Sequence, residues 1–346
     1  MNDANSVRVG LVLPEAYYGE EEWRNAEPAL RYLDEAARQG AQIVCFPEGY
    51  PGPATGPLDS PRWPFQPLEA LAARARELGV YVLAGDVTVA PEVVGAHRLN
   101  LRLLGPDGGI LATYVRVQPD TPPLNAYLYD GKAHLLPGRE FAVVPTPWAR
   151  LGLEICSELF VPEISRILML RGAEIIVAPV HGLHSEAALE LTDTWRCVAR
   201  ARAAENLCFV LVTQNLFLAP GFDYRTHVAG GAFVAGPERM EAASEKEGVL
   251  AVTLDLDRLR WLRSRNYDEE NLGPPSRDAR PLGCRPGQIW ERDPALFREL
   301  AEPHRYSFNY GYAREGLDAW EKEYEWIYEG RYREIRDRRG AFRFTR

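Results

Sequence analysis

Long apolar runs are missing from this 346-residue sequence, and none approaches the roughly 18 residues that a membrane-spanning helix needs. The first residues, MNDANSVRVGLVLPE, have no basic region followed by a long apolar stretch, so they do not resemble a signal peptide. We therefore expect a cytoplasmic protein that makes no membrane contact.

Paired cysteines and lysine-rich segments are missing too. The five cysteines are an odd number and include no CxxC pair, which argues against disulfides and a structural zinc site. The net charge is −9, and no basic run offers a surface for nucleic acid. Only three lysines occur, Lys132, Lys246 and Lys322, so any catalytic lysine must be one of these three.

What the sequence does contain is a globular composition, with 46% apolar and 26% charged residues. Over about the first 260 residues, apolar segments bounded by turn residues alternate with amphipathic segments, a pattern typical of a layered α/β domain. The expected strands are 7–14, 42–48, 80–87, a hairpin within 99–117, 141–146, 150–156, 174–180, 207–215, 230–236 and 248–257, and the expected helices are 27–40, 67–78, 161–171 and 185–205.

The character of the sequence changes near Arg265. Residues 266–286 are rich in proline, glycine and charge, while an aromatic residue at every fourth position from Trp320 to Tyr332 predicts a helix over 317–338. We predict a catalytic domain over 1–264 and a C-terminal extension over 265–346 that acts as an oligomerisation arm and helix, because its aromatic side chains would otherwise leave a large exposed apolar patch.

The segment LGLEICSELFVPE places Cys156 where an apolar strand ends and a helix begins. Open α/β sheets keep their chemistry at such strand ends, and backbone N–H groups at the start of a helix stabilise a thiolate. Cys156 is therefore a candidate nucleophile. The alternative is a structural cysteine, since free cysteines commonly pack as small hydrophobic residues.

A second segment, CFPEGYPG, also ends a strand in a reactive side chain, the carboxylate of Glu48. Glu48 alone could be a turn or capping residue. Two strands that deliver their side chains to one edge of a sheet can place a carboxylate beside a thiol, however, and that pair suggests a general base and a nucleophile.

These two segments and the order of the surrounding ones resemble the nitrilase or carbon–nitrogen hydrolase superfamily over about residues 7–263. Further matching landmarks are GPDGGILATYVRV, Pro137 with Gly138, RGAEIIVAP, RAAEN, Asn215 and LDLDRLR. The resemblance implies a four-layer α-β-β-α sandwich that forms a homodimer or higher homo-oligomer across its helical faces. It also implies a small-molecule substrate, with no metal and no organic cofactor.

The resemblance further implies a mechanism. The Cys156 thiolate attacks an amide or nitrile carbon, Glu48 acts as general base, a lysine together with the N–H of Ser157 stabilises the oxyanion, and water releases the acyl-enzyme.

This sequence departs from the family at the lysine. In TYVRVQP the lysine position holds Arg116, and the His-Leu pair that usually follows is replaced by Gln118 and Pro119. A guanidinium is planar and permanently protonated, so the exchange is not conservative. Lys132 is the other candidate for the cation, and the sequence leaves the two open.

Four further residues are candidates for the substrate site. Ser157 offers its N–H to the oxyanion. Glu154 lies two residues before Cys156 and so on the same face of the strand, and it needs a partner for which Arg116 or Lys132 is expected. His181 and His184 occupy a stretch that often lines the pocket in this family, and His181 is the better candidate.

The sequence therefore predicts a thiol hydrolase that cleaves a non-peptide C–N bond in a small amide or an N-acyl or N-carbamoyl compound. One alternative is a nitrilase, although true nitrilases usually carry Trp-Glu after the cysteine, where this chain has Ser157 and Glu158. Another is a family member that lost hydrolysis along with its lysine and serves as a binding or scaffold protein.

Overall fold

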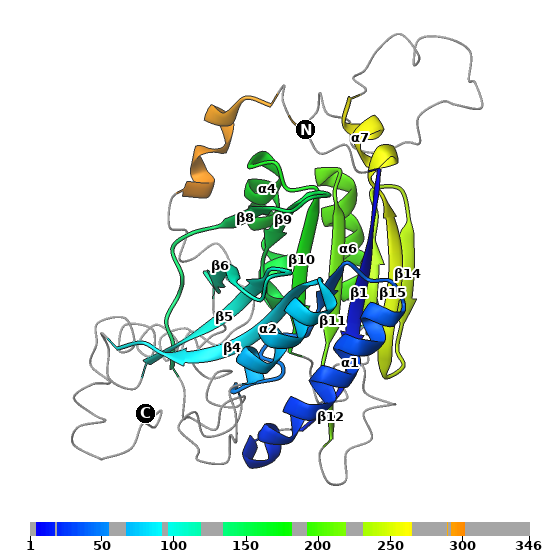
Figure 1. The fold of residues 1–346 in the computed structure, drawn as a ribbon. Coiled ribbons are helices and arrows are strands. Elements are labelled where there is room, and N and C mark those ends of the chain that lie inside the picture. The colour runs from blue at the N-terminus through cyan, green and yellow to red at the C-terminus, as the bar shows by residue number, and fades with distance from the viewer. Residues whose placement is uncertain are drawn as a thin grey trace, which may run out of the picture.

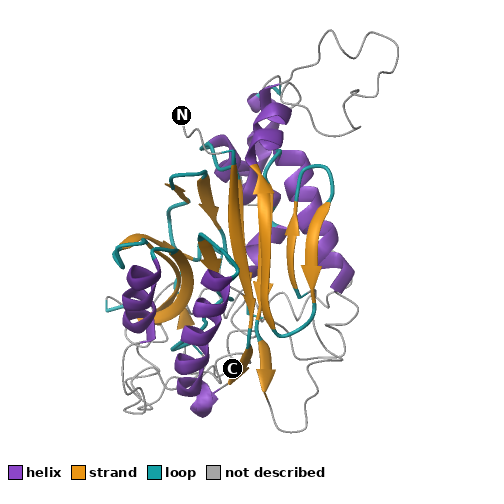
Figure 2. Cartoon of the chain, turned by 45° about the vertical axis from the view of Figure 1, so that its right-hand side comes forward, coloured by secondary structure: helices purple, strands orange, loops and turns teal. Residues whose placement is uncertain are grey.

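Two β-sheets stacked face to face form the centre of the molecule, and helices cover both outer faces (Figure 1). The computed structural model describes residues 5–17, 19–54, 67–91, 96–118, 134–181, 192–218, 231–264, 289 and 292–301. In Figure 2 helices lie on both sides of the orange strands, which gives the predicted α-β-β-α order.

The first sheet has the order β15-β1-β3-β4-β5-β6, with β7 paired to β5. β1 runs parallel to β3 and antiparallel to β15, so the sheet is mixed. Its strands are β1 (Ser6–Leu13), β3 (Ile43–Cys45), β4 (Tyr81–Val89), β5 (Ala96–Leu104), β6 (Ile110–Val115), β7 (His134–Leu135) and β15 (Gly248–Asp255).

The second sheet has the order β14-β13-β11-β10-β9-β8, with β9, β10 and β11 parallel at its centre. Its strands are β8 (Ala142–Pro145), β9 (Arg150–Leu153), β10 (Ile175–Val180), β11 (Phe209–Gln214), β13 (Ala232–Ala235) and β14 (Met240–Ser244). A separate short pair joins β2 (Glu15–Tyr17) to β12 (Leu216–Leu218).

The helices divide between the two outer faces. The α-helices are α1 (Ala26–Arg38), α2 (Pro67–Leu78), α4 (Pro162–Leu170), α6 (Thr192–Asn206) and α7 (Leu256–Ser264), and the 3₁₀ helices are η1 (Gly19–Asn25), η2 (Cys156–Phe160) and η5 (Pro294–Ala301). No helix in these described segments is long and apolar enough to cross a membrane.

Three apolar clusters hold the four layers together, and the period-2 alternation of the strands sorts side chains among them. Leu11 of β1 and Val177 of β10 belong to the cluster between the sheets. Val12, the neighbour of Leu11, packs instead with α1 and α2. Ile176, the neighbour of Val177, packs with α4 and α6.

Most predicted elements are confirmed, and α2 begins and ends where its periodicity places it. The sequence missed the strands β2, β7, β12 and β14, the first three of which are only two or three residues long, and the helix α7. The predicted helix over 317–338 and the extended stretch over 266–286 lie outside the described residues, so the division of the chain at residue 264 stays a prediction.

Gly85 in β4 sets how closely the turn after β3 can approach the sheet. A Cβ atom at Gly85 would lie 2.5 Å from the backbone nitrogen of Gly49, next to Glu48. We predict that Gly85→Ala displaces this turn, lowers the free energy of unfolding by about 1–3 kcal/mol and reduces turnover. Denaturant unfolding and amide hydrolysis measure the two effects.

Gly109→Ala is the matched control, because the nearest atom to its Cβ is 3.3 Å away on the flexible side chain of Asp107. Equal losses in the two variants would contradict the role given to Gly85.

Candidate active site

The candidate residues come together because each follows the carboxyl end of a strand. Glu48 follows β3 and Arg116 follows β6 in the first sheet, while Cys156, His181 and Asn215 follow β9, β10 and β11 in the second. Loops at this edge are where α/β folds place their chemistry. The site therefore lies where the strand ends of both sheets meet.

Glu48 is buried, with 3% of its surface exposed, and each carboxylate oxygen has a strong donor. Oε1 pairs with Nη1 of Arg116 at 3.0 Å. Oε2 accepts a hydrogen bond of 2.7 Å from the backbone N–H of His181. These contacts hold Glu48 as an acceptor with a fixed orientation, as a general base requires.

Arg116 is the largest fully buried side chain in the described structure, with 1% exposure. Its guanidinium spans two partners, since Nη1 donates to Glu48 and Nη2 donates to the hydroxyl of Ser157 at 2.5 Å. A buried charge is tolerated only when it is paired and hydrogen-bonded. Arg116 therefore lies against Ser157, the residue that follows Cys156.

Cys156 opens η2 immediately beyond the end of β9 and is partly exposed. Its φ angle of +55° lies in the left-handed region, which residues other than glycine rarely adopt. Such backbone outliers cluster at active sites. Here the turn directs the chain from a buried strand into η2 and then into α4, leaving the thiol accessible.

Glu158 is a functional residue whose role the sequence did not reveal. Oε1 accepts the backbone N–H groups of Val117 and Gln118 at 2.7 and 2.9 Å. Oε2 accepts the N–H of Ile155 at 2.7 Å and the hydroxyl of Tyr114 at 2.8 Å. This fully buried carboxylate thereby joins the Arg116 segment to the Cys156 turn. The sequence feature that could have indicated this role is an acidic residue so close to the cysteine in an apolar stretch.

The electrostatics of Glu158 follow from burial opposed by these donors. Burial raises the pKa of its carboxyl, while Arg116 and the donated hydrogen bonds act in the opposite direction. Three of the four partners are backbone N–H groups, which can only donate, so the geometry suits the ionised form.

Asn215 was recognised as a landmark without a role. Its side-chain amide donates hydrogen bonds of 3.0 Å to the backbone carbonyls of Glu48 and His181. The amide therefore joins the loops that follow β3 and β10, one from each sheet. Buried Asn215 thus helps to fix the turn that presents Glu48.

Of the remaining candidates from the sequence, only some lie within the described residues. Lys132 and His184 lie outside the described residues. His181 is buried and reaches the site through its backbone N–H. Ser157, expected to contribute only its N–H, also brings its hydroxyl to Arg116.

Glu154 has a different partner from the one expected. We predicted an ion pair with Arg116 or Lys132, but the carboxylate accepts a hydrogen bond of 2.9 Å from Ser165 of α4. The prediction assumed that strand alternation continues to Cys156. Ile155 is still extended, but Cys156 has a φ of +55° and so has left the extended conformation. At such a turn, residues two apart no longer share a face.

The burial of Glu154 changes its ionisation. Complete burial raises the pKa of Glu154 to about 8, and the Ser165 hydrogen bond and the charge of Arg202 counteract only part of this effect. Glu154 is therefore mainly protonated near neutral pH, so it needs no cation beside it.

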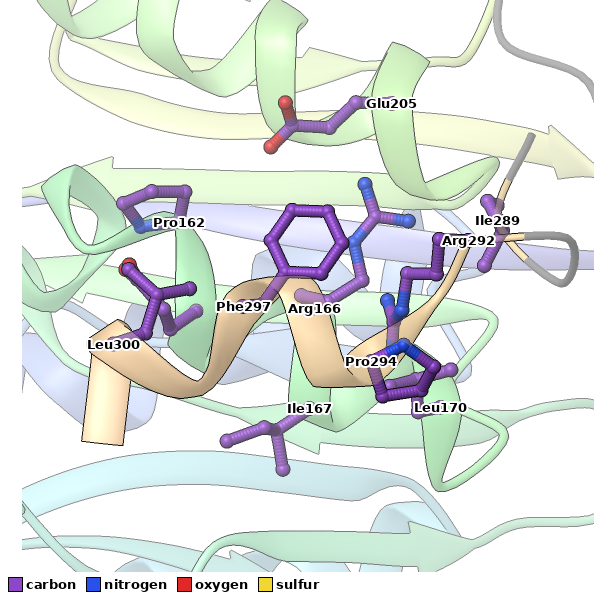
Figure 3. Close-up of a pocket in the computed structure, with 11 residues that line it drawn as sticks. Pro162, Arg166, Ile167, Leu170, Glu205, Ile289, Arg292, Pro294, Phe297 and Leu300 are labelled. Carbon is purple, nitrogen blue, oxygen red and sulfur yellow. The ribbon is translucent and has the colours of Figure 1, made fainter.

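A separate hollow of about 550 Å³ lies on the outer side of α4. It is lined by α4, by Glu205 of α6 and by the segment around η5, with Arg166 and Phe297 on facing walls (Figure 3). Neither Cys156 nor Glu48 lines it. This hollow is distinct from the catalytic candidates.

Comparison with known proteins agrees with this geometry. A family model described as carbon-nitrogen hydrolase matches residues 8–264. The chain belongs to the carbon-nitrogen hydrolase family. Omega-amidase NIT2 of Homo sapiens is 28% identical over 250 residues, covering 69% of this chain and 86% of that enzyme. Deaminated glutathione amidase of Synechocystis sp. is 30% identical over 252 residues, covering 69% and 89%.

Solved structures of carbon-nitrogen hydrolases share the fold. An amidase from Nesterenkonia sp. superposes with a TM-score of 0.61 at 22% identity, covering 76% of this chain and 95% of that one. Nit3 of Saccharomyces cerevisiae, a member of branch 10 of the nitrilase superfamily, gives 0.61 at 18% identity, covering 75% and 94%. The predicted family, sandwich fold and amidase-like hydrolase class are confirmed.

Glu154 makes stability depend on pH. Its folded-state pKa of about 8 lies above the ordinary glutamate value of 4.5, so across that window the folded protein holds a proton that the unfolded chain has lost. The contribution of Glu154 to stability is fully present below about pH 4.5 and is lost as the pH rises towards 8. Glu154→Gln removes this dependence. We predict that the free energy of unfolding of Glu154→Gln, relative to that of the wild type, rises by on the order of a few kcal/mol as the pH increases from 5 to 8.

Denaturant titrations at several pH values test this expectation, with Glu140→Gln, at an exposed position, as control for the chemical change. A difference between Glu154→Gln and wild type that stays constant with pH would contradict it.

Proposed function

We propose that this carbon-nitrogen hydrolase cleaves the C–N bond of a small neutral carboxamide or N-acyl compound through an acyl-enzyme on Cys156. The observation that carries the proposal is the buried network in which Arg116 bridges Glu48 and Ser157, the residue next to the nucleophile. It holds a carboxylate and a cation against the residue that follows the proposed nucleophile.

In the first half-reaction, the Cys156 sulfur bonds to the amide carbon and Glu48 takes the thiol proton. The tetrahedral oxyanion is stabilised by the positive charge of Arg116 and by the N–H of Ser157. Glu48 then gives its proton to the departing amine as the C–N bond breaks, leaving a thioester.

In the second half-reaction, water adds to the thioester carbon while Glu48 accepts the water proton. Collapse of the second tetrahedral intermediate breaks the C–S bond, releases the carboxylic acid and restores the thiol. Arg116 is the proposed cation in both steps because it contacts both Glu48 and the hydroxyl of Ser157.

The relatives support an amide over a nitrile. Two of the curated relatives are amidases by name, and a Nesterenkonia amidase variant carries the acetamide moiety of fluoroacetamide on its active-site cysteine. In addition, Cys156 is followed by Ser157 and Glu158, and not by the Trp-Glu that usually follows the cysteine of true nitrilases.

Two substitutions test the proposed roles. With a panel of short aliphatic and N-acyl amides, we predict that Cys156→Ala reduces turnover to background, at least about 10⁴-fold, because no acyl-enzyme can form. Glu48→Gln should lose about 10²–10⁴-fold, since the amide cannot carry the proton. Steady-state kinetics and intact-mass detection of the acyl adduct are the measurements.

Cys197→Ala, at an exposed thiol, is the control and should match the wild type. Faster turnover of matched nitriles than of amides would instead establish the nitrilase alternative. If Cys156 forms no adduct with any substrate of either class, the result would contradict a hydrolytic function and favour a binding role.

We further propose that the enzyme works in the cytoplasm as a homo-oligomer that assembles through the face formed by α4 and η5. That face exposes large apolar side chains, which isolated proteins seldom leave in contact with water. They are Phe160, Leu170, Leu296, Phe297 and Leu300.

We predict that Phe297→Asp weakens the assembly and shifts the mass measured by light scattering towards the monomer, because it places a charge in the apolar face. Val89→Asp, at a position on β4 that is 62% exposed, is the control and should leave the mass unchanged. Identical masses for wild type and Phe297→Asp at all concentrations would exclude this face.

A further inference from the structure

The replacement of the family's lysine by Arg116 coincides with an unusual contact beside the nucleophile. The hydroxyl of Ser157 lies 2.5 Å from Nη2 of Arg116, while Nη1 lies 3.0 Å from Glu48. One guanidinium thus spans the distance between the proposed base and the residue that follows the proposed nucleophile.

The shape of the guanidinium explains why a second acceptor matters. Its nitrogens are fixed in one plane, so an acceptor on each of two nitrogens fixes the orientation of the group as well as its position. An ammonium is a compact point charge on a flexible stem and has no plane to orient. A second acceptor therefore fixes the orientation of an arginine at this position, whereas a lysine would not need one.

Glu158 provides the backbone frame for this contact. Its carboxylate holds the N–H of Val117, directly after Arg116, and the N–H of Ile155, directly before Cys156. The start of the arginine side chain and the turn that carries Ser157 are therefore held at one separation. With both backbones fixed, the Ser157 hydroxyl lies where it helps to set the angle of the guanidinium.

We propose that the Ser157 hydroxyl is a positioning residue that adapts this site to arginine, by holding the Arg116 guanidinium in the plane that pairs it with Glu48. This role rests on the proposed function of Arg116 as the site's cation. It is distinct from the contribution of the Ser157 backbone N–H, which any residue at that position supplies.

A double-mutant cycle between Arg116 and Ser157 tests the proposal, using Ser157→Ala, Arg116→Lys and the double variant. Lysine keeps the positive charge and so avoids leaving Glu48 buried without a cation. We expect Ser157→Ala alone to lower kcat about 10- to 100-fold with KM changed less than about threefold, because positioning acts on the transition state more than on binding. In the Arg116→Lys background the same change should cost less than about threefold, because the interacting partner has been removed.

Two variants separate positioning from general damage. Ser157→Thr keeps the hydroxyl and should recover kcat to within about fivefold of the wild type. Ser264→Ala makes the same deletion at an exposed serine of α7 and should change nothing. Thermal unfolding of every variant confirms that each is folded.

Alkylation of Cys156 by iodoacetamide gives a readout that does not depend on amide hydrolysis. The sulfur bonds to the reagent's methylene carbon and iodide leaves, at a rate that depends on how well the thiolate is stabilised by nearby positive charge. We expect Ser157→Ala to slow this reaction about 3- to 10-fold, and to slow it much less when Arg116 is already lysine.

The outcomes distinguish this inference from the proposed function. Equal effects of Ser157→Ala in both backgrounds, or no effect with Arg116 present, would overturn the positioning role even if amides are hydrolysed. If the wild type turns over no amide, the proposed function fails, and the alkylation cycle alone still decides whether Ser157 acts through Arg116.

Discussion

The ion pair between Arg116 and Glu48 is the interaction on which the arrangement of the site depends. Both residues follow strands of the first sheet, and both are almost completely buried. Removing one member of a buried pair typically costs about 3–5 kcal/mol, because the remaining charge keeps its desolvation penalty without a partner. The pair is sustained by contacts to the second sheet, since Ser157 accepts from Arg116 and the N–H of His181 donates to Glu48. The same hydrogen bonds that satisfy the buried charges therefore align the strand ends of the two sheets.

The loops of the site are fixed by polar contacts, whereas the layers behind them are fixed by apolar packing. Glu158 binds backbone groups on both sides of the gap between Arg116 and Cys156, and the Asn215 amide binds the carbonyls of Glu48 and His181. Electrostatic stabilisation of a transition state is effective when its dipoles and charges are oriented before the reaction. A site built on backbone positions held by buried side chains meets that condition, because none of these groups has to reorient when substrate arrives.

The four layers and the candidates Glu48 and Cys156 could be predicted from the sequence, but the identity of the cation could not. The apolar runs of β1 and β10 and the amphipathic pattern of α2 were readable because each reports a local geometry. Glu48 and Cys156 could be proposed from the sequence because strand ends carry a recognisable turn. The choice between Arg116 and Lys132 depended on tertiary distances that no local pattern encodes. Glu158, and not Glu154, contacts the segment after Arg116 because the chain leaves the extended conformation at Cys156, so strand alternation does not decide which of the two acids lies towards that segment.

Arginine at this position also restricts how protons move in the proposed reaction. An ammonium in a low-dielectric site can lose its proton, and lysines are known to serve as bases when buried, but a guanidinium remains protonated throughout the accessible pH range. Arg116 can therefore stabilise charge without exchanging a proton. The proton removed from Cys156 then has Glu48 as its acceptor, and the same carboxyl must deliver it to the leaving amine before water can react. Because Arg116 donates to Glu48 directly, any rotation of the guanidinium changes both the oxyanion stabilisation and the basicity of the one group that carries the proton. A fixed guanidinium is thus a requirement of the chemistry as well as of the fold, and the Ser157 hydroxyl is placed where it meets both.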